Sequence, residues 1–101
     1  MTSHERIAKR NIVGAFNWIV GGYYNCIQDG YEEDLPETKE DLINEIYESA
    51  MTDAYGPGHM SCGKAPREMR FAGKEFCMKV VNHLMETDGD VKEIAEVKGW
   101  N

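Results

Sequence analysis

The chain has 101 residues, of which 42% are hydrophobic and 29% are charged. This length supports one domain with one core, and the abundance of apolar residues argues against a disordered chain. The formal net charge is −7, and residues 30–56 alone contain nine acidic groups and one basic group. Direct binding to nucleic acid through a broad basic face is disfavoured, because that binding depends on Lys and Arg neutralising phosphates.

The cysteines and the apolar runs indicate in which cellular compartment the protein is expected. The three cysteines are Cys26, Cys62 and Cys77. Their odd number and a polar start without a signal peptide argue against a disulfide-built secreted domain. The most apolar run, residues 12–27, is interrupted by Asn17 and Asn25 and is shorter than the roughly 20 residues of a membrane-spanning helix. We therefore expect a cytoplasmic protein without membrane contact.

The first segment predicts a helix over residues 4–29. Thr2 and Glu5 have the spacing of a capping box, and apolar residues follow at intervals of three and four. Gly14 and Gly21 lie one heptad apart on one face, where each costs about 1 kcal/mol of helix propensity. Either another helix packs closely there, or the glycine pair that begins at Gly21 breaks the segment. We favour one helix with a close crossing.

The second segment predicts a helix over residues 38–55, capped by Thr38 with Asp41 in the capping-box position. Apolar pairs recur every four residues and define an apolar stripe: Leu42, Ile43, Ile46, Tyr47, Ala50, Met51, Ala54 and Tyr55. Such a stripe must face a core or a partner. It is wide enough to exceed what a core of this size covers, so a homodimer is an alternative.

The last third of the chain predicts two more helices. Pro66 suits the first position of a helix over residues 66–87. A short extended piece near residues 69–72 is possible instead, with the helix beginning near Lys74. A final helix is expected over residues 90–98. The whole chain is thus expected to form a single domain, a small compact all-α bundle of about four helices.

Histidines and cysteines offer a weak metal or thiol site. His59 and Cys62 lie in a Gly-rich loop, and Cys77 and His83 follow on the third helix. Residues six apart on a helix point about 240° away from each other, so Cys77 and His83 do not face one ion, and we predict no metal and no cofactor. Cys62, flanked by His59 and Lys64, retains the alternative of a reactive thiol or zinc protein.

The acidic residues are the main candidate site. Glu45 and Glu48 lie too far into their helix to be explained by the macrodipole, and only Lys39 offers local compensation. A row of carboxylates imitates a row of phosphates and can occupy a groove built for nucleic acid. The predicted partner-binding residues are Glu32, Glu33, Asp34, Glu37, Asp41, Glu45 and Glu48. They cluster on a solvated face and not in an apolar pocket, so we predict no enzymatic activity.

Two interpretations of this acidity remain open, since acidic faces also serve solubility alone. The more specific one is a non-catalytic inhibitor that occupies the nucleic-acid-binding groove of a larger basic protein. Small acidic proteins of phages and mobile elements, including several anti-CRISPR proteins, act in this way, and the analogy rests on size and charge. A basic segment around Arg67, Arg70 and Lys74 offers a possible second contact. The alternatives are the homodimer that uses the apolar stripe and the thiol or zinc protein that uses Cys62.

Overall fold

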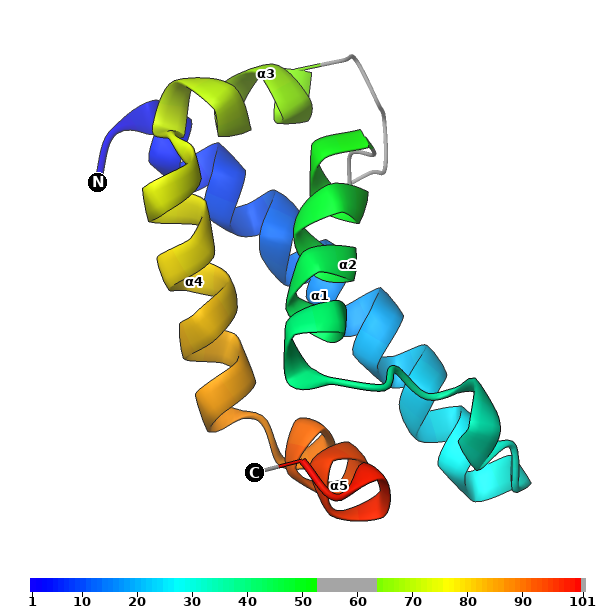
Figure 1. Cartoon of the computed structure of the whole chain (residues 1–101). Coiled ribbons are helices and arrows are strands. Elements are labelled where there is room, and N and C mark those ends of the chain that lie inside the picture. The colour runs from blue at the N-terminus through cyan, green and yellow to red at the C-terminus, as the bar shows by residue number, and fades with distance from the viewer. Residues whose placement is uncertain (53–63, 101) are drawn as a thin grey trace.

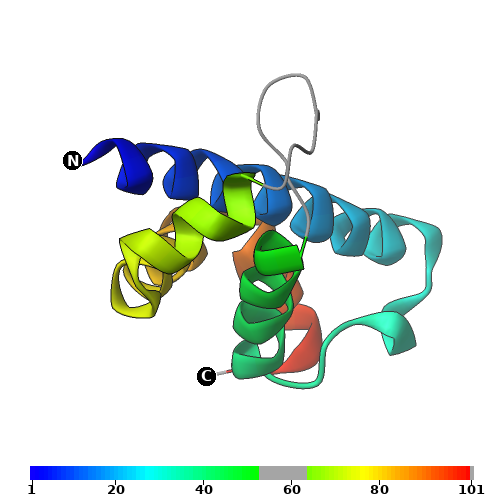
Figure 2. The same cartoon turned by 90° about the horizontal axis from the view of Figure 1, so that it is seen from above.

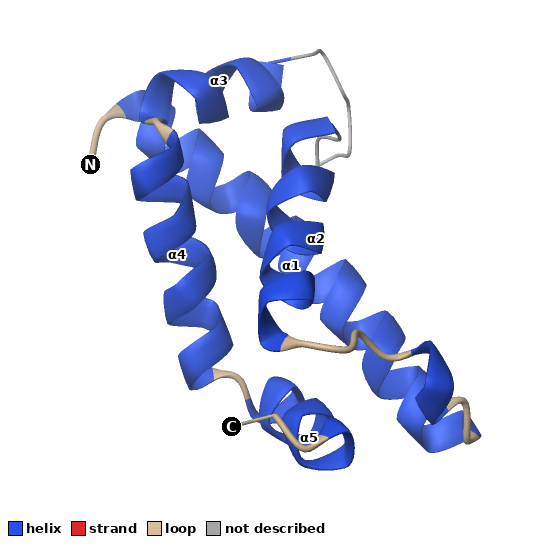
Figure 3. Cartoon of the chain, viewed as in Figure 1, coloured by secondary structure: helices blue, strands red, loops and turns tan. Residues whose placement is uncertain are grey.

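The protein is all-helical in the part that the structure, a computed structural model, describes: residues 1–52 and 64–100 (Figure 1). The helices are α1 (Ser3–Asp29), η1 (Glu32–Asp34), α2 (Lys39–Thr52), α3 (Lys64–Ala72), α4 (Lys74–Thr87) and α5 (Gly89–Lys98). These residues contain no strand (Figure 3). The predicted small all-α bundle is therefore confirmed. No helix among the described residues is both long enough and apolar enough to cross a membrane.

Helix α1 is continuous, as favoured from the sequence. The Thr2 hydroxyl accepts a hydrogen bond from the Glu5 N–H, and the Glu5 carboxylate accepts one from the Thr2 N–H, which completes the predicted capping box. Gly30 ends the helix with a φ of 85°, a left-handed conformation that glycine adopts without strain. The close crossing is not found at Gly21, where a Cβ would meet nothing within 4 Å.

The predicted helix over residues 66–87 is wrong as one unit, because it breaks at Gly73. Gly73 has a φ of 94°, and its N–H donates to the Met69 carbonyl at 3.0 Å. This closes α3 and lets α4 begin at Lys74. The extended alternative for residues 69–72 is also wrong, since these residues are helical. Glycine permits this corner because it lacks the Cβ that disfavours positive φ.

The core lies on one side of α1, where α2, α3, α4 and α5 are arranged (Figure 2). Its members from α2 are Leu42, Ile43, Ile46 and Ala50, all buried inside the chain. Tyr47 and Met51 pack partly buried against the same core. The described part of the apolar stripe is thus covered by the chain itself. Ala54 and Tyr55 lie outside the described residues, and the homodimer alternative stays a prediction.

Candidate functional site

The seven acidic side chains predicted to bind a partner are all exposed, and six of them fall into two groups. Asp41, Glu45 and Glu48 project from one face of α2, because they are separated by four and three residues. We call these three the α2 acidic row. With Asn44, Ser49 and Thr52 they line an open hollow of about 480 Å³.

The other group belongs to η1, which consists of Glu32, Glu33 and Asp34. This turn lies beside the C-terminal end of α1 and apart from the body of α2 (Figures 1 and 2). The acids from the loop therefore do not extend the α2 acidic row as one continuous ridge. The α2 acidic row is the more regular of the two surfaces.

Glu37 lies between the groups and binds the C-terminal part of the chain. Its carboxylate is 3.4 Å from Lys98 Nζ, and its carbonyl accepts a hydrogen bond from Trp100 Nε1 at 3.1 Å. Exposed ion pairs of this kind contribute at most about 1 kcal/mol. Glu37 is thus partly neutralised, and it helps to hold α5 against the start of α2.

The start of α2 explains part of the acidity. The Thr38 hydroxyl accepts a hydrogen bond from the Asp41 N–H at 3.1 Å, as expected of a helix cap. Glu40 and Asp41 lie in the first turn, where the positive end of the helix dipole favours anions. Glu45 and Glu48 have no such local reason. Among the described residues, no ion pair joins any member of the α2 acidic row to a cation.

Glu45 has a partner that sequence reasoning missed. The Tyr23 hydroxyl, from α1, lies 2.6 Å and 2.7 Å from the two Glu45 carboxylate oxygens and donates to them. Burial of Tyr23 and its hydrogen bond to Glu45 raise the pKa of the phenol well above its usual range. The hydroxyl therefore remains a donor at neutral pH. This contact fixes the central carboxylate of the row and connects α2 to α1.

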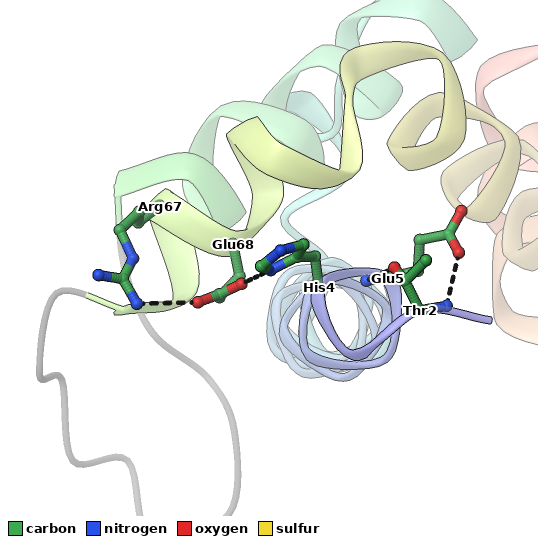
Figure 4. Close-up of polar contacts among 5 residues, drawn as sticks. All are labelled: Thr2, His4, Glu5, Arg67 and Glu68. Carbon is green, nitrogen blue, oxygen red and sulfur yellow. Dashed lines mark hydrogen bonds and ion pairs between the residues drawn. The ribbon is translucent and has the colours of Figure 1, made fainter.

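A second polar cluster lies where the start of α1 meets α3 (Figure 4). The Glu68 side chain, only 7% exposed, accepts hydrogen bonds from His4 Nδ1 and from Arg67, the latter at 3.0 Å. The bonds from His4, and then those from Arg67, lower the pKa of the Glu68 carboxyl. The His4 ring also packs against the Phe71 ring, with centroids 5.0 Å apart. This cluster attaches the start of α1 to α3. It also pairs Arg67 with a carboxylate of the same chain.

The cysteine and histidine residues that the structure describes do not form a metal site. Cys77 is fully buried, and burial raises the pKa of its thiol, whereas His83 is exposed on α4. The described part of the chain contains no group of three or more His, Cys, Asp or Glu side chains able to hold an ion. His59 and Cys62 lie outside the described residues, so the thiol alternative stays a prediction.

The fold and the site together define a small all-α protein with an acidic row on its second helix. Comparison with protein-family models, with curated proteins and with solved structures found no match to this chain. Its function is therefore inferred from its own residues.

Proposed function

We propose that this protein is a non-catalytic binding module whose α2 acidic row engages a larger basic protein. In the most concrete form, it is an inhibitor that occupies the nucleic-acid-binding groove of that protein in the cytoplasm, as several anti-CRISPR proteins of phages and mobile elements do. The carrying observation is the exposure of Asp41, Glu45 and Glu48 along one face, with no ion-pair partner among the described residues.

The spacing of the row supports a phosphate-like role. At about 1.5 Å of rise per residue, the three carboxylates succeed each other at about 6 Å and 4.5 Å along the helix axis. One DNA strand carries a phosphate about every 3.4 Å along its axis. The charge density of the row is therefore lower than that of DNA but of the same order. Such a row can attract Lys and Arg side chains over a distance and steer a basic partner toward α2.

Preorganisation supports the same role. The buried face of α2 packs into the core, and Tyr23 fixes the Glu45 carboxylate. A carboxylate that is already fixed loses less conformational entropy when a partner binds. A carboxylate has about four acceptor sites, so Glu45 still has capacity for a guanidinium or an ammonium group.

The experiment compares three immobilised baits in a cell lysate at low and at high salt. One bait is the wild type and the second is Asp41→Lys/Glu48→Lys, which leaves the Tyr23 contact intact. The third is a matched control, Glu86→Lys/Glu93→Lys, which makes the same charge change at exposed positions of α4 and α5. We expect the wild type and the control to capture a basic protein at low salt, and the second bait to lose it.

Displacement by nucleic acid tests whether the captured protein binds through its nucleic-acid-binding groove. A duplex of DNA or RNA added to the loaded bait should displace the captured protein, because both ligands would occupy one site. If all three baits capture the same proteins, the α2 acidic row serves solvation and the proposal fails. If capture depends on the row but nucleic acid does not displace the partner, the binding module stands and the groove assignment is wrong.

A further inference from the structure

The outer face of α1 has no partner in the described part of the chain. Helices α2, α3, α4 and α5 all lie on one side of α1, and no described element lies on the opposite side (Figure 2). Asn17, Trp18, Gly21, Gly22, Tyr24 and Asn25 line an open hollow of about 470 Å³ on this helix. We call this surface the α1 outer face. Trp18 is 75% exposed, which is a large apolar side chain left in water.

Gly21 and Gly22 are not explained by packing inside the chain. A Cβ at either position would meet nothing within 4 Å, so the described residues leave room for alanine there. Each glycine nevertheless costs about 1 kcal/mol of helix propensity relative to alanine. An open, glycine-lined surface beside an exposed tryptophan suits the close approach of a second helix.

The charges along α1 indicate which partner helix, and in which direction, would be complementary to it. Arg6 and Arg10 are exposed near its start, and Asp29 is exposed in its last turn. This order opposes the macrodipole of α1, which favours acids at the start and bases at the end. Two copies of α1 side by side in parallel would place like charges together. An antiparallel pair would place the basic part of each copy beside the acidic end of the other.

We propose that a second copy of this chain covers the α1 outer face, with the two α1 helices antiparallel about a two-fold axis level with position 20. Such an axis pairs positions whose numbers sum to 40. Trp18 then lies opposite Gly22 of the second copy, and Arg10 lies at the level of Gly30 of the second copy, next to Asp29 in the last turn of α1. The interface is isologous, as two-fold symmetry requires. Because α2 lies on the other side of α1 (Figure 2), both α2 acidic rows stay exposed, and this inference is independent of the proposed function.

Light scattering after size exclusion tests the mass. We expect twice the chain mass of 11.5 kDa at high concentration, with dissociation on dilution. Trp18→Ala removes a side chain that is largely outside the core, and it should raise the dissociation constant at least about tenfold. A monomer mass for the wild type at about 0.5 mM would overturn the proposal, since even a dimer with a Kd of about 100 μM would be mainly associated there.

The glycines provide a test with opposite signs. Gly21→Ala/Gly22→Ala should raise the Tm measured at a concentration where the wild type is monomeric, because helix propensity improves without a clash. The same change should weaken the dimer at high concentration, because two methyl groups separate the helices. A variant that raises the monomer Tm and leaves the dissociation constant unchanged would show that another surface forms the dimer.

Charge exchange tests the orientation. Arg6→Glu/Arg10→Glu and Asp29→Lys should each be monomeric, because each brings like charges together at both ends of the interface. A mixture of the two should dimerise, since both ends are then complementary. Lys79→Glu/Lys92→Glu, at exposed positions of α4 and α5, is the control and should remain dimeric. If the mixture stays monomeric while circular dichroism shows both variants helical, the antiparallel arrangement is wrong.

Discussion

Tyr23→Phe isolates the contact that fixes the α2 acidic row. The substitution removes one oxygen and leaves the ring, which packs against the core. The lost interaction is the hydrogen bond to the Glu45 carboxylate, made at 2.6 Å and 2.7 Å from its two oxygens. Hydrogen bonds to charged groups contribute about 1.5–3 kcal/mol. Because this one is open to solvent, we expect a loss of about 1 kcal/mol, which lowers the Tm by about 4–8 °C in a domain near this size.

The assay is urea unfolding of a double-mutant cycle formed by Tyr23→Phe and Glu45→Ala. If the hydroxyl acts through Glu45, the loss of free energy of unfolding in the double mutant should be smaller than the sum of the two single losses by about 1 kcal/mol. Tyr24→Phe is the matched control and should change stability by less than about 0.5 kcal/mol, since no hydrogen bond of its hydroxyl occurs within the described residues. Strict additivity of the cycle would refute the reasoning.

Stability of the wild type should depend on pH through Tyr23. Burial first, and then the hydrogen bond to Glu45, raise the pKa of this phenol above the usual value near 10. The folded state then retains the phenolic proton at pH values where the unfolded chain has lost it. The free energy of unfolding contributed by Tyr23 is fully present below about pH 10 and falls as the pH rises above it. Tyr23→Phe should remove this alkaline loss, so the stabilities of the two proteins should converge at high pH.

Three further predictions concern residues that join the helices. Buried Asn11 donates to the carbonyl of Ala50 in the last turn of α2, so Asn11→Leu should cost about 1–3 kcal/mol in urea unfolding. His4 and Arg67 lower the pKa of Glu68. The stability that Glu68 contributes is therefore present above its ordinary pKa and is lost as the pH falls through the pKa of the folded state. Glu68→Gln should show a smaller drop in Tm between pH 7 and pH 3 than the wild type. Gly73→Ala should lower the free energy of unfolding by about 1–2 kcal/mol, because alanine is strained at a φ of 94°.

Local signals in the sequence were sufficient to predict most of the helices. The capping box of Thr2 and Glu5 and the glycine after Asp29 mark the two ends of α1, and the apolar stripe identifies α2. The break at Gly73 was missed because apolar periodicity continues on both sides of it, and a single glycine inside such a pattern is often tolerated. Only the observed φ shows that this glycine forms a corner.

The site was predicted less completely than the fold. Exposure of the acids could be inferred from helical periodicity, since they lie opposite the apolar stripe. The contacts that fix them could not, because Tyr23 and Glu45 are 22 positions apart and His4 and Glu68 are 64 apart. No local pattern links residues at such distances. Packing of the helices brings them together.

Two surfaces of this protein carry features that lower the stability of the isolated chain. Like charges recur along the α2 acidic row and repel each other by a few tenths of a kcal/mol per pair. On α1, Gly21 and Gly22 and a charge order that opposes the macrodipole weaken the longest helix of the described chain. Sequences that specify one fold generally agree across such local and global levels, and conflicts concentrate at functional sites. A basic partner would relieve the first conflict and a second copy the other, and because the two surfaces lie on different sides of α1 (Figure 2), neither contact prevents the other.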